Sequence, residues 1–410
     1  MCEKIKTYCS HFWQKLNPFG FIFRYYLATF FGGLMFYVSV LVPFYTQWGH
    51  LNLTQVQILQ SWLMIWMFIF NIPTGVFADH FGRKISVALG NLIFAVSCVL
   101  YFLTTGFYPF LIAEFLMALG TSFVIGANSS LIYDFLKQNN REGESKKILG
   151  RASAISSLAM VVAAPIGSII AANFGIRMPM LVTAAPVLIA SFVILTIHEP
   201  NRYEKGQRPN PFETIKKGVG FFLTNKNLKF LVFNDLLVWI GAYFLVWLYQ
   251  PTLIKAGLAI VYFGLIRSAF SLAGMAATFN IHLTEKLFGS EKRFVNTTAL
   301  IVSACLLLVA ISPGVVTVII AIVLIGGFAS ARTSYLNTTM NEFIPPEQRA
   351  TVLSSTSTVN MLVFAVANPI VGYIADHSLR LAFISVGILP LIAFFLFRYS
   401  PFSKKISVSQ

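Results

Sequence analysis

Charged side chains are rare inside the long apolar stretches of this sequence, and those that occur there are the first candidates for chemistry. Asp235 lies in "VFNDLLVW" and Arg332 lies in "GGFASARTSYLN". A carboxylate in apolar surroundings can bind and release a proton, or it can pair with a guanidinium, because burial and a nearby opposite charge have opposing effects on its ionisation. Glu114 and Arg267 are two further isolated charges. Each of these positions is therefore a candidate for coupling or for solute binding.

A second group of charges interrupts the apolar sequence at "NIPTGVFADHFGRK", residues 71–84. A carboxylate at Asp79, near the end of one helix, can accept hydrogen bonds from the free N–H groups at the start of another helix and from Arg83. Gly75 removes a side chain so that a neighbouring helix can approach, and Gly82 permits a turn. Arg83 and Lys84 can anchor the start of the following helix at a membrane surface.

The elements that carry these residues are long apolar helices. The chain has 410 residues, of which 57% are hydrophobic, and a mean hydropathy of +0.74, whereas soluble domains are roughly 45–50% apolar. The apolar runs are about 20 residues long, enough for a helix to cross a hydrocarbon core of about 30 Å. The two-residue alternation of a membrane β-barrel is absent from them. We therefore expect an all-α polytopic membrane protein and exclude a soluble globular one.

The apolar runs, and the polar residues and helix breakers between them, predict twelve transmembrane helices. An even number of spans places both termini on the same side of the membrane. The predicted spans cover residues 21–45, 55–78, 85–105, 109–136, 148–172, 179–197, 229–250, 258–281, 295–312, 315–340, 353–375 and 380–398.

Lysine and arginine in the connections predict the orientation, because these residues are retained on the cytoplasmic side. The odd-numbered connections carry only Arg177, Lys255 and Arg380, whereas the even-numbered ones carry many more. Both termini are therefore expected in the cytoplasm. The predicted organisation is a cytoplasmic tail (1–20), a six-helix half (21–197), a cytoplasmic central loop (198–228), a second six-helix half (229–398) and a cytoplasmic tail (399–410).

The two halves contain similar local patterns, which indicates an internal repeat. One offset places "YDFLKQNNR" (133–141) over "NEFIPPEQR" (341–349) and "APIGSIIA" (164–171) over "NPIVGYIA" (368–375). Two parallel six-helix repeats are an architecture in which the solute path runs between the halves near the membrane midplane.

With twelve spans, cytoplasmic termini, a long central loop and this repeat, the chain resembles the major facilitator superfamily over essentially its whole length. Gly75, Asp79, Gly82, Arg83 and Lys84 match the pattern G-x-x-x-D-x-x-G-R-K, which is the signature of that superfamily in the loop between spans two and three. The likeness is to its drug/proton antiporter-like branch, although span five has Ala164 before Pro165 where such antiporters often have Gly-Pro.

The resemblance implies roles for several charged residues. The signature loop would form a conformational latch with the start of span eleven, near Val352 to Ser357, and the latch would break when the cytoplasmic face opens. Spans one, four, seven and ten would line the cavity, so Asp235 and Arg332 can meet. Such a pair is either a switched, proton-sensitive salt bridge or a permanent structural ion pair.

Other residues are candidates for coupling and for the substrate cavity. Arg24 and Asp134 could pair near the cytoplasmic ends of spans one and four, or both could instead extend to the headgroups. Glu114 and Arg267 could touch the solute, and Arg267 is the better candidate because its burial is costlier. The uncharged cavity candidates are Asn128, Tyr133, Tyr335, Asn337, Trp247 and Gln250.

These features predict a secondary active transporter that moves a small organic solute by alternating access, with export and proton coupling. The alternative within transport is uptake, or facilitated movement, of a polar or anionic metabolite bound by Arg332 and Arg267. A receptor that does not transport is a third possibility on the same fold. We expect no enzyme activity, cofactor, metal site or nucleic-acid partner, because the sequence has no phosphate-binding loop, metal-ligand cluster or nucleophile elbow. A monomer in a bacterial-type inner or plasma membrane is expected.

Overall fold

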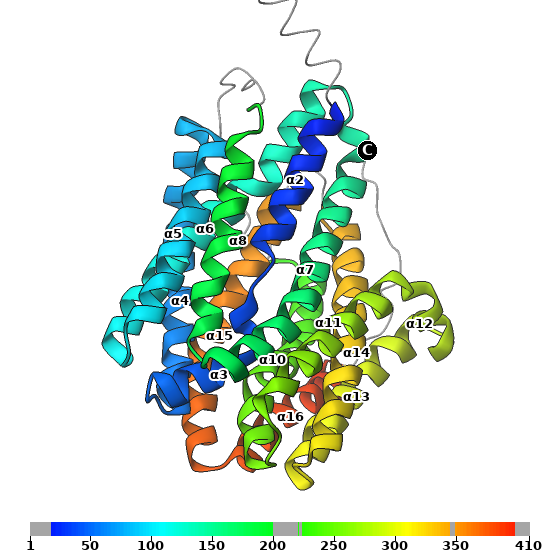
Figure 1. The fold of residues 1–410 in the computed structure, drawn as a ribbon. Helices are drawn as coiled ribbons and strands as arrows, with labels where there is room; N and C mark the ends of the chain where they lie inside the picture. Colours follow the sequence, from blue (N-terminus) through cyan, green and yellow to red (C-terminus); the bar gives the residue numbers. More distant parts are fainter. Residues whose placement is uncertain (1–17, 200–219, 221–223, 345–348, 398–410) are drawn as a thin grey trace, which may run out of the picture.

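The computed structural model of this chain describes residues 18–199, 220, 224–344 and 349–397, and all the long elements in this part are helices (Figure 1). The two predicted tails, except for Pro18, Phe19 and Gly20 of the first tail, lie outside the described residues, as does most of the predicted central loop.

Twelve helices of the described part are long and apolar enough to cross a membrane, which confirms the predicted fold class. The long helices are α2 (Pro18–Gly32), α4 (Leu53–Phe81), α5 (Arg83–Leu103), α6 (Phe107–Gln138), α7 (Ser145–Phe174), α8 (Met178–Leu195), α10 (Lys226–Lys255), α11 (Phe263–Phe279), α13 (Glu291–Ile311), α14 (Val315–Glu342), α15 (Arg349–His377) and α16 (Leu379–Leu396). Short elements are η1 (Phe36–Val40), α3 (Leu41–Pro43), η2 (Phe44–Trp48), η3 (Glu142–Glu144), η4 (Ile260–Tyr262) and α12 (Ile281–Phe288).

The first span is interrupted. The sequence analysis predicted one continuous helix over residues 21–45, and this prediction is wrong. α2 ends at Gly32, and regular structure resumes as η1, α3 and the π-helical η2. A Cβ at Gly33 would lie 2.9 Å from Ala159 Cβ, so the glycine allows α7 to approach closely at the break. The amide of Phe36, freed by the break, donates to Thr183 Oγ1 on α8 at 3.1 Å. Neighbouring helices thus replace the hydrogen bonds that the first span lacks.

The helices before the central loop pack mainly with one another, as in α5 with α6 and α2 with α8, and so do those after it, as in α11 with α14 and α13 with α16. We call them the N-terminal and C-terminal helices. Two extensive helix pairs join the sets, α4 with α15 and α7 with α11. We call the end of the bundle where α2 begins and α16 ends the terminal end, and the opposite end the far end.

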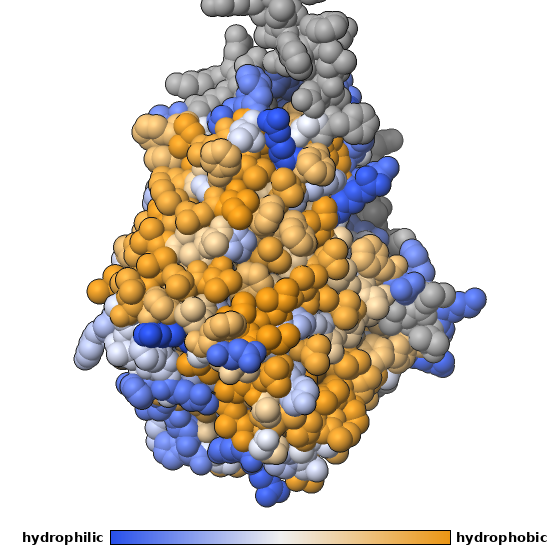
Figure 2. Space-filling view, in the orientation of Figure 1, coloured by the Kyte–Doolittle hydropathy of each residue, from blue (hydrophilic) through white to orange (hydrophobic). Residues whose placement is uncertain are grey.

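The surface of the bundle is apolar around its middle. Figure 2 shows hydrophobic side chains over the centre of one face, with hydrophilic side chains at the top and bottom. Phe192, Val366 and Phe395 are among the large apolar side chains exposed at 66 to 70%. Apolar side chains that face outward in this way suit the hydrocarbon core of a bilayer, where helices satisfy their own backbone hydrogen bonds.

Candidate functional site

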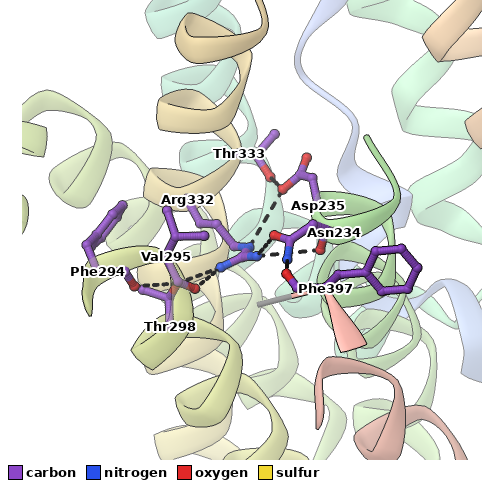
Figure 3. Close-up of polar contacts among 8 residues, drawn as sticks. All are labelled: Asn234, Asp235, Phe294, Val295, Thr298, Arg332, Thr333 and Phe397. Carbon is purple, nitrogen blue, oxygen red and sulfur yellow. Dashed lines mark hydrogen bonds and ion pairs between the residues drawn. The ribbon is translucent and has the colours of Figure 1, made fainter. Parts of the chain in front are cut away.

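Asp235 on α10 and Arg332 on α14 lie together in the interior of the C-terminal helices, as the sequence led us to expect (Figure 3). Arg332 Nε is 4.0 Å from Asp235 Oδ1, and Thr333 Oγ1 donates to the same carboxylate oxygen at 3.0 Å. The side chain of Arg332 is only 1% exposed and that of Asp235 is 14% exposed. The carboxylate thus has one cation and one hydroxyl near it, and it is the less enclosed of the pair.

The guanidinium of Arg332 is held mainly by neutral groups, which the sequence analysis did not identify. It donates to Asn234 Oδ1, to the carbonyl oxygen of Val295 and, at 3.0 Å, to Thr298 Oγ1. Asn234 Nδ2 in turn donates to the carbonyl oxygen of Phe397 at 2.5 Å (Figure 3). The sequence contained one indication of these neutral partners, namely the polar Asn234 beside Asp235 in an otherwise apolar span. Because these acceptors occupy its Nη donors and its Nε faces the Asp235 carboxylate, Arg332 is poorly placed to bind a solute as well.

Glu114 on α6 is buried at 1% exposure, within a group of hydroxyl and amide side chains. Its Oε1 accepts hydrogen bonds from Tyr45 at 2.7 Å and from Gln60 at 3.2 Å, and the hydroxyl oxygens of Tyr45 and Tyr101 are 3.2 Å apart. Its Oε2 has no hydrogen-bond partner among the described residues. A carboxyl surrounded by neutral donors, with one free oxygen, can hold a proton. Tyr45, Gln60 and Tyr101 were not predicted as its partners.

The charged turn between α4 and α5 contacts α6 and the segment after α8 at the terminal end. Arg83 forms an ion pair with Asp134 and donates to the carbonyl oxygen of Ser130 at 2.6 Å. The carboxylate of Glu199 accepts from the backbone N–H of Arg83 at 2.6 Å and so caps α5. Gly82 has a φ of +117°, and a Cβ there would lie 2.5 Å from the Glu199 carboxylate. The turn at this position therefore requires glycine.

Of the two alternatives for Arg24 and Asp134, the ion pair is not formed, because Arg83 pairs with that carboxylate while Arg24 donates to the carbonyl oxygen of Thr196 at 2.7 Å. No heavy atom of the described chain lies within 4 Å of a Cβ built at Gly75, although a Cβ at Gly126 on α6 would lie 3.9 Å from the Gly75 backbone nitrogen. The predicted role of Gly75 in helix approach therefore stays a prediction.

The other two latch residues lie at the surface of the same end. Asp79 is exposed in the last turns of α4, and Lys84 Nζ lies 3.4 Å from the carbonyl oxygen of Leu195. The expected partner of Asp79 is the start of α15, where the side chains of residues 349–355 lie outside the described part. The contact between Asp79 and span eleven therefore stays a prediction.

A cavity of about 240 Å³ lies between the interrupted first span and helices α10 and α11. Three of the predicted cavity residues, Trp247, Gln250 and Arg267, line it. Its other lining residues are apolar or aromatic: Val38, Leu41, Val42, Trp239, Ala242, Tyr243, Val246 and Phe270.

Gln250 connects the two sets of helices beside this cavity. Its Nε2 donates to the carbonyl oxygens of Val38 and Ser39 at 3.3 and 3.1 Å, and its Oε1 accepts from the N–H of Val42 at 2.9 Å. One amide on α10 thereby satisfies backbone groups of the interrupted first span.

The remaining predicted cavity residues lie elsewhere. Asn128 lines a second cavity of about 250 Å³ among the N-terminal helices, together with Asn91 and Thr121. Tyr133 and Asn337 are exposed, and the ring of Tyr335 packs edge-on against Phe294 at 5.8 Å. None of these last three predicted residues lines either of the two cavities.

The two sets of helices touch tightly in the half of the bundle nearer the far end. A Cβ at Gly264 on α11 would overlap the carbonyl oxygen of Ala164 on α7, and Ser268 Oγ donates to the carbonyl oxygen of Val161 at 2.7 Å. Ser61 Oγ on α4 donates to the carbonyl oxygen of Ala365 on α15 at 2.7 Å. Helices this close exclude solute from passing between them.

Asp376, at the end of α15, closes the far end further. Its carboxylate accepts from the N–H groups of Leu53 and Thr54 at 2.7 and 2.8 Å and from Thr54 Oγ1. These N–H groups begin α4, where the helix dipole favours a negative charge. The sequence analysis did not identify this contact, which resembles the latch predicted for the terminal end.

Comparison with known proteins gives consistent matches. A profile of the Major Facilitator Superfamily matches residues 25–295 and 257–409. An uncharacterized transporter of Buchnera aphidicola subsp. Schizaphis graminum (strain Sg) is 34% identical over 107 residues, 26% of each chain. Multidrug resistance protein 1 of Bacillus subtilis (strain 168) is 30% identical over 159 residues, 38% of this chain and 40% of that protein. These alignments therefore span less than half the length of the curated relatives.

Two solved structures share the fold at low sequence identity. The nucleoside transporter NupG has a TM-score of 0.74 and 13% identity, covering 93% of this chain and 100% of that one. A bacterial homolog of the human lysosomal transporter Spinster, in an inward-facing and unoccupied conformation, has a TM-score of 0.76 and 16% identity, covering 94% and 99%.

Proposed function

Because this chain belongs to the Major Facilitator Superfamily, we propose that it is a secondary transporter that moves a small organic solute across the membrane by alternating access. The moving units are the N-terminal and C-terminal helices, residues 21–197 and 229–398. The terminal end faces the cytoplasm, as the basic connections favour. The chain acts as a monomer.

The observation that carries the proposal is the closure of the bundle at one end. The far end is closed by the contact of α7 with α11 and by the carboxylate of Asp376 on α15, which accepts from the start of α4. Beside the cavity, Gln250 on α10 binds the first span and so joins the two sets of helices. Alternating access requires such contacts to break while others form at the terminal end. The signature residues Asp79, Gly82, Arg83 and Lys84 lie at that end and form the proposed second latch.

Two carboxylates inside the helix bundle, the buried Glu114 and the half-buried Asp235, support proton coupling. Asp235 is 4.0 Å from Arg332, and Glu114 is held by tyrosine and glutamine donors. Each carboxylate can bind or release a proton. When the helices move and its surroundings change, its protonation state can change with them. Export is supported by relatives such as Multidrug resistance protein 1 of Bacillus subtilis.

The test uses purified protein in liposomes that enclose a pH-sensitive dye, under an imposed proton gradient. Lipophilic cations, organic anions and sugars are added in turn. We expect one class to drive proton flux, and we expect Asp235→Asn to abolish that flux. Glu291→Gln, which removes an exposed carboxylate at the start of α13, is the matched control.

Each outcome decides a different part of the proposal. Solute movement without proton flux would refute coupling and make Asp235 a structural partner of Arg332. The absence of any solute movement, in protein that binds a solute, would refute transport and favour a receptor on this fold.

A further inference from the structure

The cavity beside the interrupted first span has one charged group in its wall. Trp239, Tyr243, Trp247 and Phe270 provide aromatic surface, and the rest of the lining is aliphatic apart from Gln250 and Arg267. Its volume of about 240 Å³ lies just below the range of roughly 300–1,000 Å³ that is usual for ligand pockets. The cavity thus suits a compact apolar body of one or two rings.

Arg267 has little to neutralise it. Its Nη1 donates to Ser271 Oγ at 2.9 Å, and its guanidinium carbon lies 5.4 Å from the centre of the Phe270 ring. Its Nε is buried without a hydrogen-bond partner, and Arg267 forms no ion pair with any described residue. The Nε of Arg332 is also without a hydrogen-bond partner among the described residues, but it lies 4.0 Å from the Asp235 carboxylate, and both Nη groups of Arg332 donate to acceptors. Arg267 differs in having no such counter-charge in the described part of the chain and one acceptor, Ser271.

The neighbouring polar groups are already engaged. The Gln250 amide is bound to the first span, and its Nε2 also lies 2.9 Å from the hydroxyl of Tyr249. Of the two carboxylates inside the bundle, Glu114 accepts from Tyr45 and Gln60, and Asp235 accepts from Thr333 beside Arg332. Neither carboxylate contacts Arg267.

A guanidinium in apolar surroundings is costly unless an anion pairs with it. A carboxylate suits it because the fork of N–H donors matches the two carboxylate oxygens, and aromatic walls suit an apolar body. A cation would meet the like charge of Arg267 and no carboxylate. A sugar would find few free acceptors among the lining side chains.

We propose that this cavity binds an amphipathic organic anion, a carboxylate attached to a compact aromatic or aliphatic body, with Arg267 as the ligand of the carboxylate. This inference rests on the proposed transport function, since it names the substrate class of the same cavity. The sequence analysis left open a polar or anionic solute bound by both Arg332 and Arg267. The present inference keeps Arg267 as a ligand and excludes Arg332.

The test compares three probes that share one ring system and differ in charge: 1-naphthoate, 1-naphthamide and 1-naphthylmethylammonium. Binding to purified protein is followed by fluorescence, and movement is followed separately by counterflow in liposomes. We expect naphthoate to bind about ten to a hundred times more tightly than the other two, as a charge-assisted hydrogen bond implies. Arg267→Gln should remove this preference and Arg267→Lys should keep part of it.

Arg177→Gln is the matched control, because Arg177 is an exposed arginine that also lies over aromatic rings, 4.6 Å from the centre of the Trp48 ring. It should leave naphthoate binding unchanged. Equal binding of the three probes, tighter binding of the ammonium, or no binding of any probe would overturn the inference. So would a preference for naphthoate that survives in a folded Arg267→Gln protein. If naphthoate binds through Arg267 without counterflow, the inferred ligand class stands and the proposed transport function fails.

Discussion

The far-end contact made by Asp376 provides a direct test of the two-state reasoning. The perturbation is Asp376→Ala, which removes the acceptor for the N–H groups of Leu53 and Thr54 and for the Thr54 hydroxyl. These contacts join α15 to α4 and so connect the two sets of helices. If the far end opens during transport, the loss of the carboxylate should favour the open state.

The magnitude follows from the type of contact. A capping side chain contributes about 0.5–2 kcal/mol, and a negative charge at a helix N-terminus adds about 0.3–1 kcal/mol when exposed. Asp376 is exposed, and Asn52 also caps α4, so we take a total of about 1–3 kcal/mol. This corresponds to a shift of roughly 5- to 150-fold in the ratio of open to closed far ends.

The assay measures access to the cavity from the far side. A cysteine at Val38, which lines the cavity, is exposed to a membrane-impermeant thiol reagent in sealed vesicles whose far end faces outward. The native Cys98 and Cys305 are buried, and the two tail cysteines are replaced by serine. We expect the labelling rate to rise by roughly 5- to 150-fold with Asp376→Ala. Thr54→Ala should cause a smaller rise, because the backbone donors remain.

Ser378→Ala is the control, because Ser378 caps α16 through the N–H of Leu381 and contacts no N-terminal helix through that bond. It should not change the labelling rate. An unchanged rate in a folded Asp376→Ala protein would refute the reasoning that this carboxylate helps to hold the far end closed.

Three further variants test other contacts. Gly82→Ala should lower the thermal midpoint through a loss of about 1–3 kcal/mol in the free energy of unfolding, because φ is +117° and ψ is 143° there, a conformation that side chains other than glycine rarely adopt. An unchanged midpoint would contradict the strain argument. Gly264→Ala places a methyl group against the Ala164 carbonyl, so it should raise far-side thiol labelling, and unaltered labelling would show that α7 and α11 adjust. Arg332→Met should lower the free energy of unfolding by about 3–5 kcal/mol, because it leaves the Asp235 carboxylate with the Thr333 hydroxyl but without a counter-charge. Adding Asp235→Asn should recover much of that loss in thermal unfolding, and no recovery would assign the cost to packing.

The partners of the charged residues show which ion pairs could be predicted from the sequence and which could not. Asp235 and Arg332 were expected to meet because the family resemblance brings their spans together, and the structure places them 4.0 Å apart. The same reasoning failed for Asp134. Depth along a helix did not distinguish Arg24 from Arg83 as its partner, and only the packing of α5 against α6 selects Arg83.

The capping carboxylates could not be predicted because they come from distant parts of the chain. Glu199 caps α5 from a position that follows α8, and Asp376 contacts the start of α4 from the end of α15. A local cap leaves a short sequence pattern, as Asn52 and Gln55 do for α4. A cap contributed from another helix leaves no such pattern.

The sequence by itself determined the class and the number of spans, because apolar length is a local property that the thickness of the bilayer dictates. It also marked the few charges that are costly to bury. Tertiary structure decided which of those charges are neutralised, since this depends on atoms brought together from separate helices. Arg332 finds several acceptors, whereas Arg267 faces an apolar cavity without a counter-charge, and the sequence around the two arginines does not distinguish these outcomes.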